Sequence, residues 1–210
     1  AFFGRVMYNY KEKYLFSASV RYEGSSRFGD NHKWGTFPAV SLGWRISREP
    51  WLKDAKWLDE LKLRAGFGIP GNQEIGNYRS LSILRKGSSN FYYNNKWIST
   101  YEPGSNPNPD LRWEKKKEFN VGLDMSVLGN RLNVTVDYYN RRTKDLLYTY
   151  TVPVPPNLYP SKFANVGTID NKGIEVTVNA TPISRKNFSW NLAATISHNK
   201  NNLVKFSNED

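Results

Sequence analysis

Apolar and polar residues alternate along most of this 210-residue chain, and one side of each alternating segment carries no charge. The clearest example is residues 14–22, where one side holds Tyr14, Phe16, Ala18, Val20 and Tyr22. A period of two predicts a β-strand whose two faces meet different environments. The alternation lasts roughly nine to eleven residues, the length that a tilted strand needs to cross a bilayer. The pattern therefore predicts transmembrane strands.

Eight such segments occur in four pairs. They cover residues 2–10, 14–22, 37–47, 61–69, 117–127, 131–141, 172–182 and 188–199. The connections within pairs are short, at residues 11–13, 48–60, 128–130 and 183–187. Gly129-Asn130 suits a hairpin turn, and Pro50 lies near the start of a predicted helical turn.

The connections between pairs are long, at residues 23–36, 70–116 and 142–171. Loops of this length are uncommon in compact soluble domains. Short turns at one rim and long loops at the other are typical of an outer-membrane β-barrel. The predicted fold class is therefore all-β: an antiparallel transmembrane barrel portion of about eight strands, with short periplasmic turns and long extracellular loops.

Charge is segregated between the two sides of the predicted strands. The uncharged side includes Val40, Leu42, Trp44, Leu63, Phe67, Val121, Leu123, Val136, Ile174, Val176 and Ile196. The opposite side holds Arg5, Arg21, Arg45, Lys62, Arg64, Glu118, Asp124, Asp137 and Glu175. A charge facing lipid near the bilayer midplane costs about 2–4 kcal/mol, so a lipid-exposed side requires this segregation. Aromatic residues near strand ends are suited to an interfacial girdle: Tyr8, Tyr10, Tyr14, Tyr22, Trp44, Tyr138 and Trp190.

A β-sandwich also alternates. The alternative interpretation is a secreted or surface β-sandwich that binds carbohydrate without transporting it. The two interpretations differ in whether the apolar side is covered by a second sheet.

Composition narrows the function classes. Aromatic residues reach 15%, whereas mean hydropathy is −0.66 and no apolar run approaches the length of a transmembrane helix. Cysteine is absent, which excludes a disulfide framework and cysteine-ligated metal. The net charge of +11 is dispersed along the chain, so we expect no nucleic-acid partner.

No catalytic motif is present, and the two histidines, His32 and His198, lie far apart in sequence. We therefore expect no enzyme, no cofactor, and no catalytic or metal-binding residues. The glycine-rich segments 24–31 and 71–78 lack the carboxylate spacing of a calcium loop and are expected to shape loops. Four acidic residues are predicted to pair with Arg or Lys on neighbouring strands: Glu118, Asp124, Asp137 and Glu175.

The predicted loops carry aromatic side chains among Ser and Asn, most densely in residues 87–97. Such rings either stack on sugars or grip peptide, or they pack the loops onto one another. Loop position and side-chain type make six residues candidates for substrate binding: Arg27, Tyr92, Tyr93, Trp97, Tyr101 and Trp113.

Several stretches resemble the barrel of the SusC/RagA family of TonB-dependent outer-membrane transporters. They include WGTFPAVSLGWRIS (34–47), NPNPDLRWEKKKEFNVGLD (106–124) and NVGTIDNKGIEVTVNATPI (165–183). Further similar stretches are residues 8–29, 57–78, 137–147 and 152–160. They occur in order across nearly the whole chain.

The resemblance implies a 22-stranded barrel in the bacterial outer membrane, a plug domain and a SusD-like surface lipoprotein that forms a lid. It implies import of glycan or peptide oligomers, powered through the TonB complex, with outer-membrane lipid around the barrel. We expect residues 1–210 to be part of the barrel domain. The chain starts directly in a strand pattern, residues 207–210 complete no unit, and signal peptide, plug and closing strands are absent. The sequence therefore predicts a piece of a longer protein.

Overall fold

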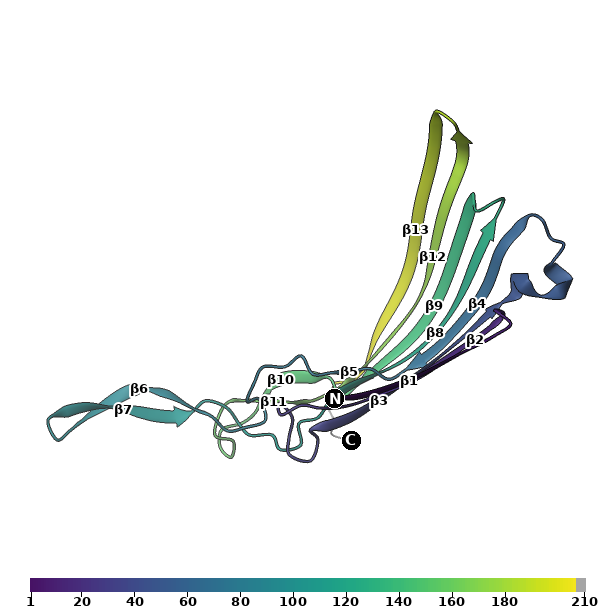
Figure 1. Ribbon diagram of the computed structural model, residues 1–210. Coiled ribbons are helices and arrows are strands. Elements are labelled where there is room, and N and C mark those ends of the chain that lie inside the picture. The colour runs from purple at the N-terminus through teal and green to yellow at the C-terminus, as the bar shows by residue number, and fades with distance from the viewer. Residues whose placement is uncertain (207–210) are drawn as a thin grey trace.

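The computed structural model describes residues 1–206 and consists of strands, two short 3-10 turns and loops (Figure 1). Residues 207–210, with which the sequence ends, lie outside the described residues. Eight long antiparallel strands form one curved sheet in the order β1-β2-β3-β4-β8-β9-β12-β13. These strands are β1 (Phe2–Tyr10), β2 (Tyr14–Gly24), β3 (Trp34–Arg45), β4 (Leu58–Gly68), β8 (Glu114–Val127), β9 (Leu132–Lys144), β12 (Thr168–Arg185) and β13 (Phe188–Lys205). The predicted all-β antiparallel fold and its eight strands are confirmed.

Short and long connections lie at opposite ends of the sheet (Figure 1). We call these the turn end (residues 11–13, 46–57, 128–131 and 186–187) and the loop end (residues 25–33, 69–113 and 145–167). The β3–β4 connection contains η1 (Ile46–Arg48) and η2 (Pro50–Leu52), so Pro50 begins a helical turn as the sequence predicts. No helix in residues 1–206 is long and apolar enough to cross a membrane.

Strand register aligns the apolar positions into continuous rows. One row crosses all eight strands through Tyr10, Tyr14, Trp44, Leu63, Leu123, Val136, Val176 and Ile196. The face that carries this row, which we call the apolar face, leaves Leu42 55% and Ile196 75% exposed. The eight long strands form one sheet rather than two packed sheets. The β-sandwich alternative is therefore wrong, because a sandwich buries its apolar face.

The structure adds strands within segments that the sequence predicted as loops. The short β5 (Gly71–Asn72) pairs with β8, and two hairpins are formed by β6 (Leu84–Tyr93) with β7 (Lys96–Pro103) and by β10 (Leu147–Thr151) with β11 (Ser161–Asn165). The β12–β13 pair has 18 residues in each strand and is longer than predicted. The extra residues continue the ladder beyond the segments where apolar alternation is regular, because backbone pairing does not require an apolar side chain.

The packing core lies at the loop end. Its buried members are Phe28, Phe37, Ile75, Leu111 and Trp113, with Leu147 and Phe163 packed against them. We call this set the loop core. Phe37 pairs with Arg21 and lies on the opposite side of β3 from Val40, so it belongs to the face that carries the charges, the polar face. The loop core therefore covers the polar face at the loop end and leaves the apolar face free.

Candidate functional site

The polar face carries a charged cluster at the middle of the sheet. Arg64 Nε and Nη2 donate to the two carboxylate oxygens of Asp124 at 2.7 and 2.9 Å, and Nη2 also donates to Asp137 at 3.0 Å. Gly122 lies beneath these groups, and a Cβ there would come within 2.3 Å of Asp137 Oδ1. The missing side chain at position 122 thus makes the space in which Arg64 spans two strands.

Ion pairs continue along the polar face towards the loop end. On this face Arg141 Nε contacts Glu118 at 3.0 Å. Arg142 is the next residue of β9 and therefore lies on the opposite side of the sheet, where it makes a two-pronged contact with Asp170 at 2.6 and 2.5 Å near the loop end. The predicted pairing of Glu118, Asp124 and Asp137 with basic residues is confirmed. It is wrong for Glu175, which has no ion pair within residues 1–206. Its strand neighbours across the sheet are Asp137 and Ser197, neither of which carries a positive charge.

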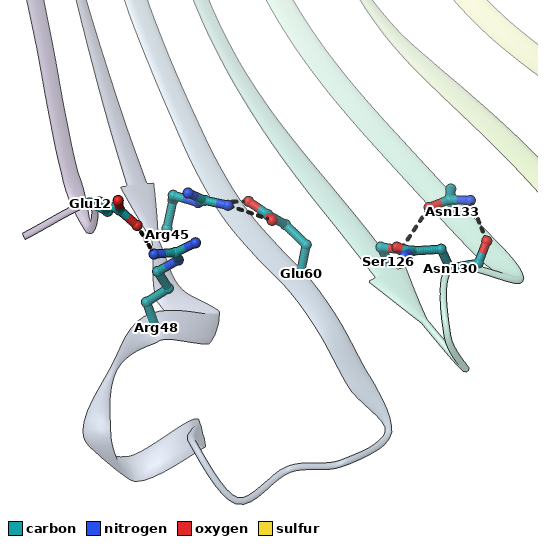
Figure 2. Close-up of polar contacts among 7 residues, drawn as sticks. All are labelled: Glu12, Arg45, Arg48, Glu60, Ser126, Asn130 and Asn133. Carbon is teal, nitrogen blue, oxygen red and sulfur yellow. Dashed lines mark hydrogen bonds and ion pairs between the residues drawn. The ribbon is translucent and has the colours of Figure 1, made fainter. Parts of the chain in front are cut away.

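Polar contacts also fix the connections at the turn end (Figure 2). Arg45 donates to both carboxylate oxygens of Glu60 at 2.9 Å, and Arg48 pairs with Glu12. In the β8–β9 turn, Asn133 accepts from the Ser126 hydroxyl at 2.7 Å and donates to the Asn130 carbonyl at 3.0 Å.

Glu49 ties the β3–β4 connection to the apolar face. Its Oε1 accepts hydrogen bonds from the Tyr14 hydroxyl at 2.7 Å and the Trp44 indole at 3.1 Å, and its Oε2 contacts Lys13 Nζ at 3.1 Å. These donors, the Tyr14 hydroxyl first, hold the pKa of Glu49 below its ordinary value. The arrangement locates the tyrosine and tryptophan of the predicted girdle at the turn end.

Aromatic contacts build the loop core around Trp113. The Trp113 ring lies 4.8 Å from the Phe28 ring and 4.9 Å from the Phe37 ring, centroid to centroid, and its indole donates to the Lys33 carbonyl at 3.1 Å. The Gly29 amide donates to the Leu111 carbonyl at 2.8 Å. A Cβ at Gly29 would come within 1.7 Å of the Pro109 carbonyl oxygen, so only glycine permits this approach.

Buried amides join the same loops to the β10–β11 hairpin. Asn106 donates to the carbonyls of Tyr159 and Ser161, Asn108 donates to the Phe163 carbonyl, and Asn165 donates to the Arg112 carbonyl. Each of these amides is less than 7% exposed, so these hydrogen bonds form away from competing water. Residues 25–33, residues 104–113 and the β10–β11 hairpin are therefore joined into one packed unit at the loop end.

The six residues predicted to bind substrate separate into two groups. Arg27 and Trp113 hold the loops together: Arg27 donates to the Asn77 side chain at 3.0 Å and to the Gln73 carbonyl at 3.1 Å, and Trp113 is only 2% exposed. Trp113 presents no free surface to a ligand, so for this residue the expectation is corrected to a packing role. The sequence could not show that this ring is buried, because an exposed tryptophan in the same loop would have the same position and residue type.

The other four predicted residues lie together on the β6–β7 hairpin, which projects from the loop end away from the sheet (Figure 1). Tyr92, Tyr93, Trp97 and Tyr101 are 55–73% exposed. Tyr92 and Trp97 face each other across the two strands with ring centroids 5.2 Å apart. The rings are open to solvent, so the alternative in which they pack the loops onto one another is wrong.

Sequence reasoning missed this hairpin and the buried amides. The hairpin did carry a signal: Asn94 and Asn95, with φ of 47° and 60°, form the kind of turn in which both central residues are left-handed, and asparagine tolerates that conformation. No local signal marks Asn106, Asn108 and Asn165, because the carbonyls that join them across the loops lie 53–55 residues away. In residues 1–206, no group of three or more His, Cys, Asp or Glu side chains is placed to hold a metal ion.

Comparison with known proteins identifies the class to which this geometry belongs. Residues 1–209 match the family described as TonB dependent receptor-like, beta-barrel. The chain belongs to this family of TonB-dependent receptor β-barrels. The barrel prediction is therefore confirmed.

Individual proteins within and beside this family show how similar the chain is to known receptors. The chain is 42% identical over 209 residues to TonB-dependent receptor P39 of Formosa agariphila, and 38% identical over 213 residues to TonB-dependent receptor SusC of Bacteroides thetaiotaomicron. These matches cover 99% and 100% of this chain but 20% and 21% of the relatives, so the chain spans about a fifth of their length. The solved RagAB peptide importer in its closed-closed state superimposes with a TM-score of 0.87 at 30% identity, covering 98% of this chain and 22% of that one. The predicted resemblance to the SusC/RagA family is confirmed.

Proposed function

We propose that this chain forms part of the wall of a bacterial outer-membrane receptor that imports glycan or peptide oligomers. One observation carries the proposal: a single sheet has an exposed apolar face that is uncharged through its middle rows, and an opposite face of paired charges. The first suits lipid and the second suits a water-filled passage. In this orientation the turn end meets the periplasm and the loop end meets the cell exterior.

The whole receptor works with partners, of which the TonB complex contacts regions beyond this chain. We assign it a SusD-like surface lipoprotein as a lid and the TonB complex as the energy source, and its role is transport rather than catalysis. The family match and the similarity to a protein named as a peptide importer support this assignment.

The β6–β7 hairpin supplies substrate contacts within this function. Its exposed rings form two faces, one with Tyr92, Trp97 and Tyr101 and the other with Phe91 and Tyr93. An isolated two-stranded hairpin is only marginally stable in water, and exposed apolar patches of this kind commonly mark binding surfaces. Rings beside amides suit stacking on sugars or on peptide side chains.

Growth of the native bacterium tests the import function. A strain that lacks the full-length receptor should fail to grow on one class of oligomer as sole carbon source and should still grow on its monomers. Unimpaired growth on every glycan and peptide offered would contradict the proposal.

Binding by the purified full-length receptor tests the hairpin. Replacing Tyr92 and Trp97 by Ala should weaken binding of the oligomer identified by growth, by about 0.5–1.5 kcal/mol for each ring contact that is lost. The matched control replaces Trp51, an equally exposed ring at the turn end, and should leave affinity unchanged. If the hairpin variant keeps its affinity but no longer co-purifies a lipoprotein, the hairpin binds the lid and not the substrate.

A further inference from the structure

A cavity at the loop end borders the loop core at Phe163 and is lined by none of the exposed rings of the β6–β7 hairpin. It has a volume of about 360 Å³ and forms where residues 76–83 and 104–106 meet the β10–β11 hairpin. We call it the loop cavity. Its size falls within the range of small-molecule pockets in proteins.

Hydrogen bonds from three loops fix the walls of the loop cavity. The Asn106 oxygen accepts from the backbone amides of Leu158 and Tyr159 at 3.0 and 3.1 Å, while its nitrogen donates to two carbonyls of the same hairpin. The Gly104 amide donates to the Ile83 carbonyl at 2.8 Å. These contacts hold the walls in place before any ligand arrives, which lowers the ordering cost of binding.

Among the described residues, Arg79 is the one cationic side chain that lines the loop cavity. Its guanidinium lies over the Phe163 ring, 5.5 Å from the centroid. Within residues 1–206 it has no carboxylate partner, whereas Arg64, Arg112 and Arg142 all have one within 2.7 Å. Gly76 leaves room for it, since a Cβ there would lie 3.2 Å from Arg79 Nε. Arg79 therefore has a fixed stacking surface and unused donors.

The remaining lining that residues 1–206 give the loop cavity is rich in hydrogen-bond donors and contains no acidic residue. The hydroxyls of Thr149 and Ser161 border it, and so does Asn77, whose oxygen already accepts from Arg27 and leaves its amide nitrogen available. The Tyr159 and Phe163 rings supply apolar surface. A cavity with one unpaired guanidinium, neutral donors and ring faces is complementary to an anionic group on a small organic unit.

We propose that the loop cavity binds a carboxylate carried by the imported oligomer, with Arg79 as its ionic partner. This inference rests on the proposed function and specifies the substrate class of that receptor. The planar guanidinium matches a carboxylate in a two-pronged geometry that a lysine does not reproduce. A uronic-acid sugar and the C-terminus of a peptide both offer this group.

Binding to the purified full-length receptor in detergent tests the inference with two matched pairs of probes. One pair is tetragalacturonate and its methyl ester, and the other is tetra-alanine and its C-terminal amide. Each affinity is measured by calorimetry for the wild type, Arg79→Gln and Arg79→Lys. The control Lys53→Gln removes one exposed positive charge from the β3–β4 connection at the turn end, outside both the loop cavity and the β6–β7 hairpin.

We expect one acidic probe to bind the wild type at least tenfold more tightly than its neutral twin, and the identity of that probe distinguishes sugar from peptide. Arg79→Gln should weaken binding of that probe about 10- to 100-fold and leave binding of its neutral counterpart unchanged. Arg79→Lys should restore only part of the preference, and Lys53→Gln should retain all of it. The inference is overturned if neither acidic probe is preferred, or if the preference survives Arg79→Gln. Import measured by growth would stand in either case, so failure of the carboxylate site and failure of the transport function remain distinguishable.

Discussion

Replacing Trp113 by Ala should open the packed loops at the loop end while the strands of the sheet stay paired. Trp113 is 2% exposed, contacts the rings of Phe28 and Phe37, and donates its indole hydrogen to the Lys33 carbonyl. Removing a buried tryptophan costs about 3–5 kcal/mol, and the orphaned carbonyl forfeits one hydrogen bond of about 1 kcal/mol within that total. The hydrogen-bonded strands do not depend on the loop core, so the loss should open the loops locally and leave the sheet paired.

Hydrogen exchange followed by mass spectrometry on the full-length receptor measures this opening of the loops. Because 1.4 kcal/mol corresponds to a factor of ten, amide protection in residues 24–34 and 104–113 should fall at least about 100-fold, with β8 and β9 unchanged in the middle of the sheet. Trp97→Ala is the matched control: the ring is 73% exposed, and its removal should alter protection only within the β6–β7 hairpin. Unchanged amide protection in the two loops after Trp113→Ala would refute the claim that the loop core stabilises them.

Three further substitutions test separate contacts. Gly29→Ala places a Cβ against the Pro109 carbonyl and should destabilise the same loops by about 1–3 kcal/mol, measured by their hydrogen exchange; unaltered exchange would count against the close approach. Glu49→Gln should speed exchange in residues 46–52 at pH 7. Since the pKa of Glu49 is lowered, its stabilising effect is present above the ordinary carboxyl range and is lost as pH falls below about 4, so variant and wild type should then converge. Gly122→Ala should lower the melting temperature of the detergent-solubilised receptor more than Gly68→Ala does, because only the first meets charged atoms within 3 Å; equal melting temperatures would exclude the steric role of Gly122.

The alternation of apolar and polar residues predicted the sheet, because the side chains of a strand point alternately to its two faces. Tyr14, Trp44 and Leu63 could be assigned to one face from alternation alone, and the register then joins them across three strands. The β8–β9 turn could also be predicted, since Gly129 and Asn130 adopt the left-handed backbone conformation that the turn requires.

The loop end could not be predicted in the same way. The loop core joins Phe28, Ile75 and Trp113 across more than 80 residues, and no periodicity links them. The β6–β7 hairpin lacks a regular two-sided pattern because both its faces carry aromatic rings and a bulge interrupts β6 after Lys86. Arg79 carries no sequence signal, since its significance comes from having no carboxylate partner among residues 1–206 of the fold.

Lipid contact along β12 tests most directly whether this chain is a barrel wall. Single cysteines at residues 174–179 of a cysteine-free full-length receptor, labelled with a fluorophore in vesicles containing brominated lipid, report which side chains meet the bilayer. Quenching should be strong at Ile174, Val176 and Val178 and weak at the alternate positions Glu175, Thr177 and Asn179, because successive side chains point to opposite faces. Equal quenching at all six positions, or stronger quenching at Glu175, Thr177 and Asn179, would contradict a wall with its apolar face in lipid.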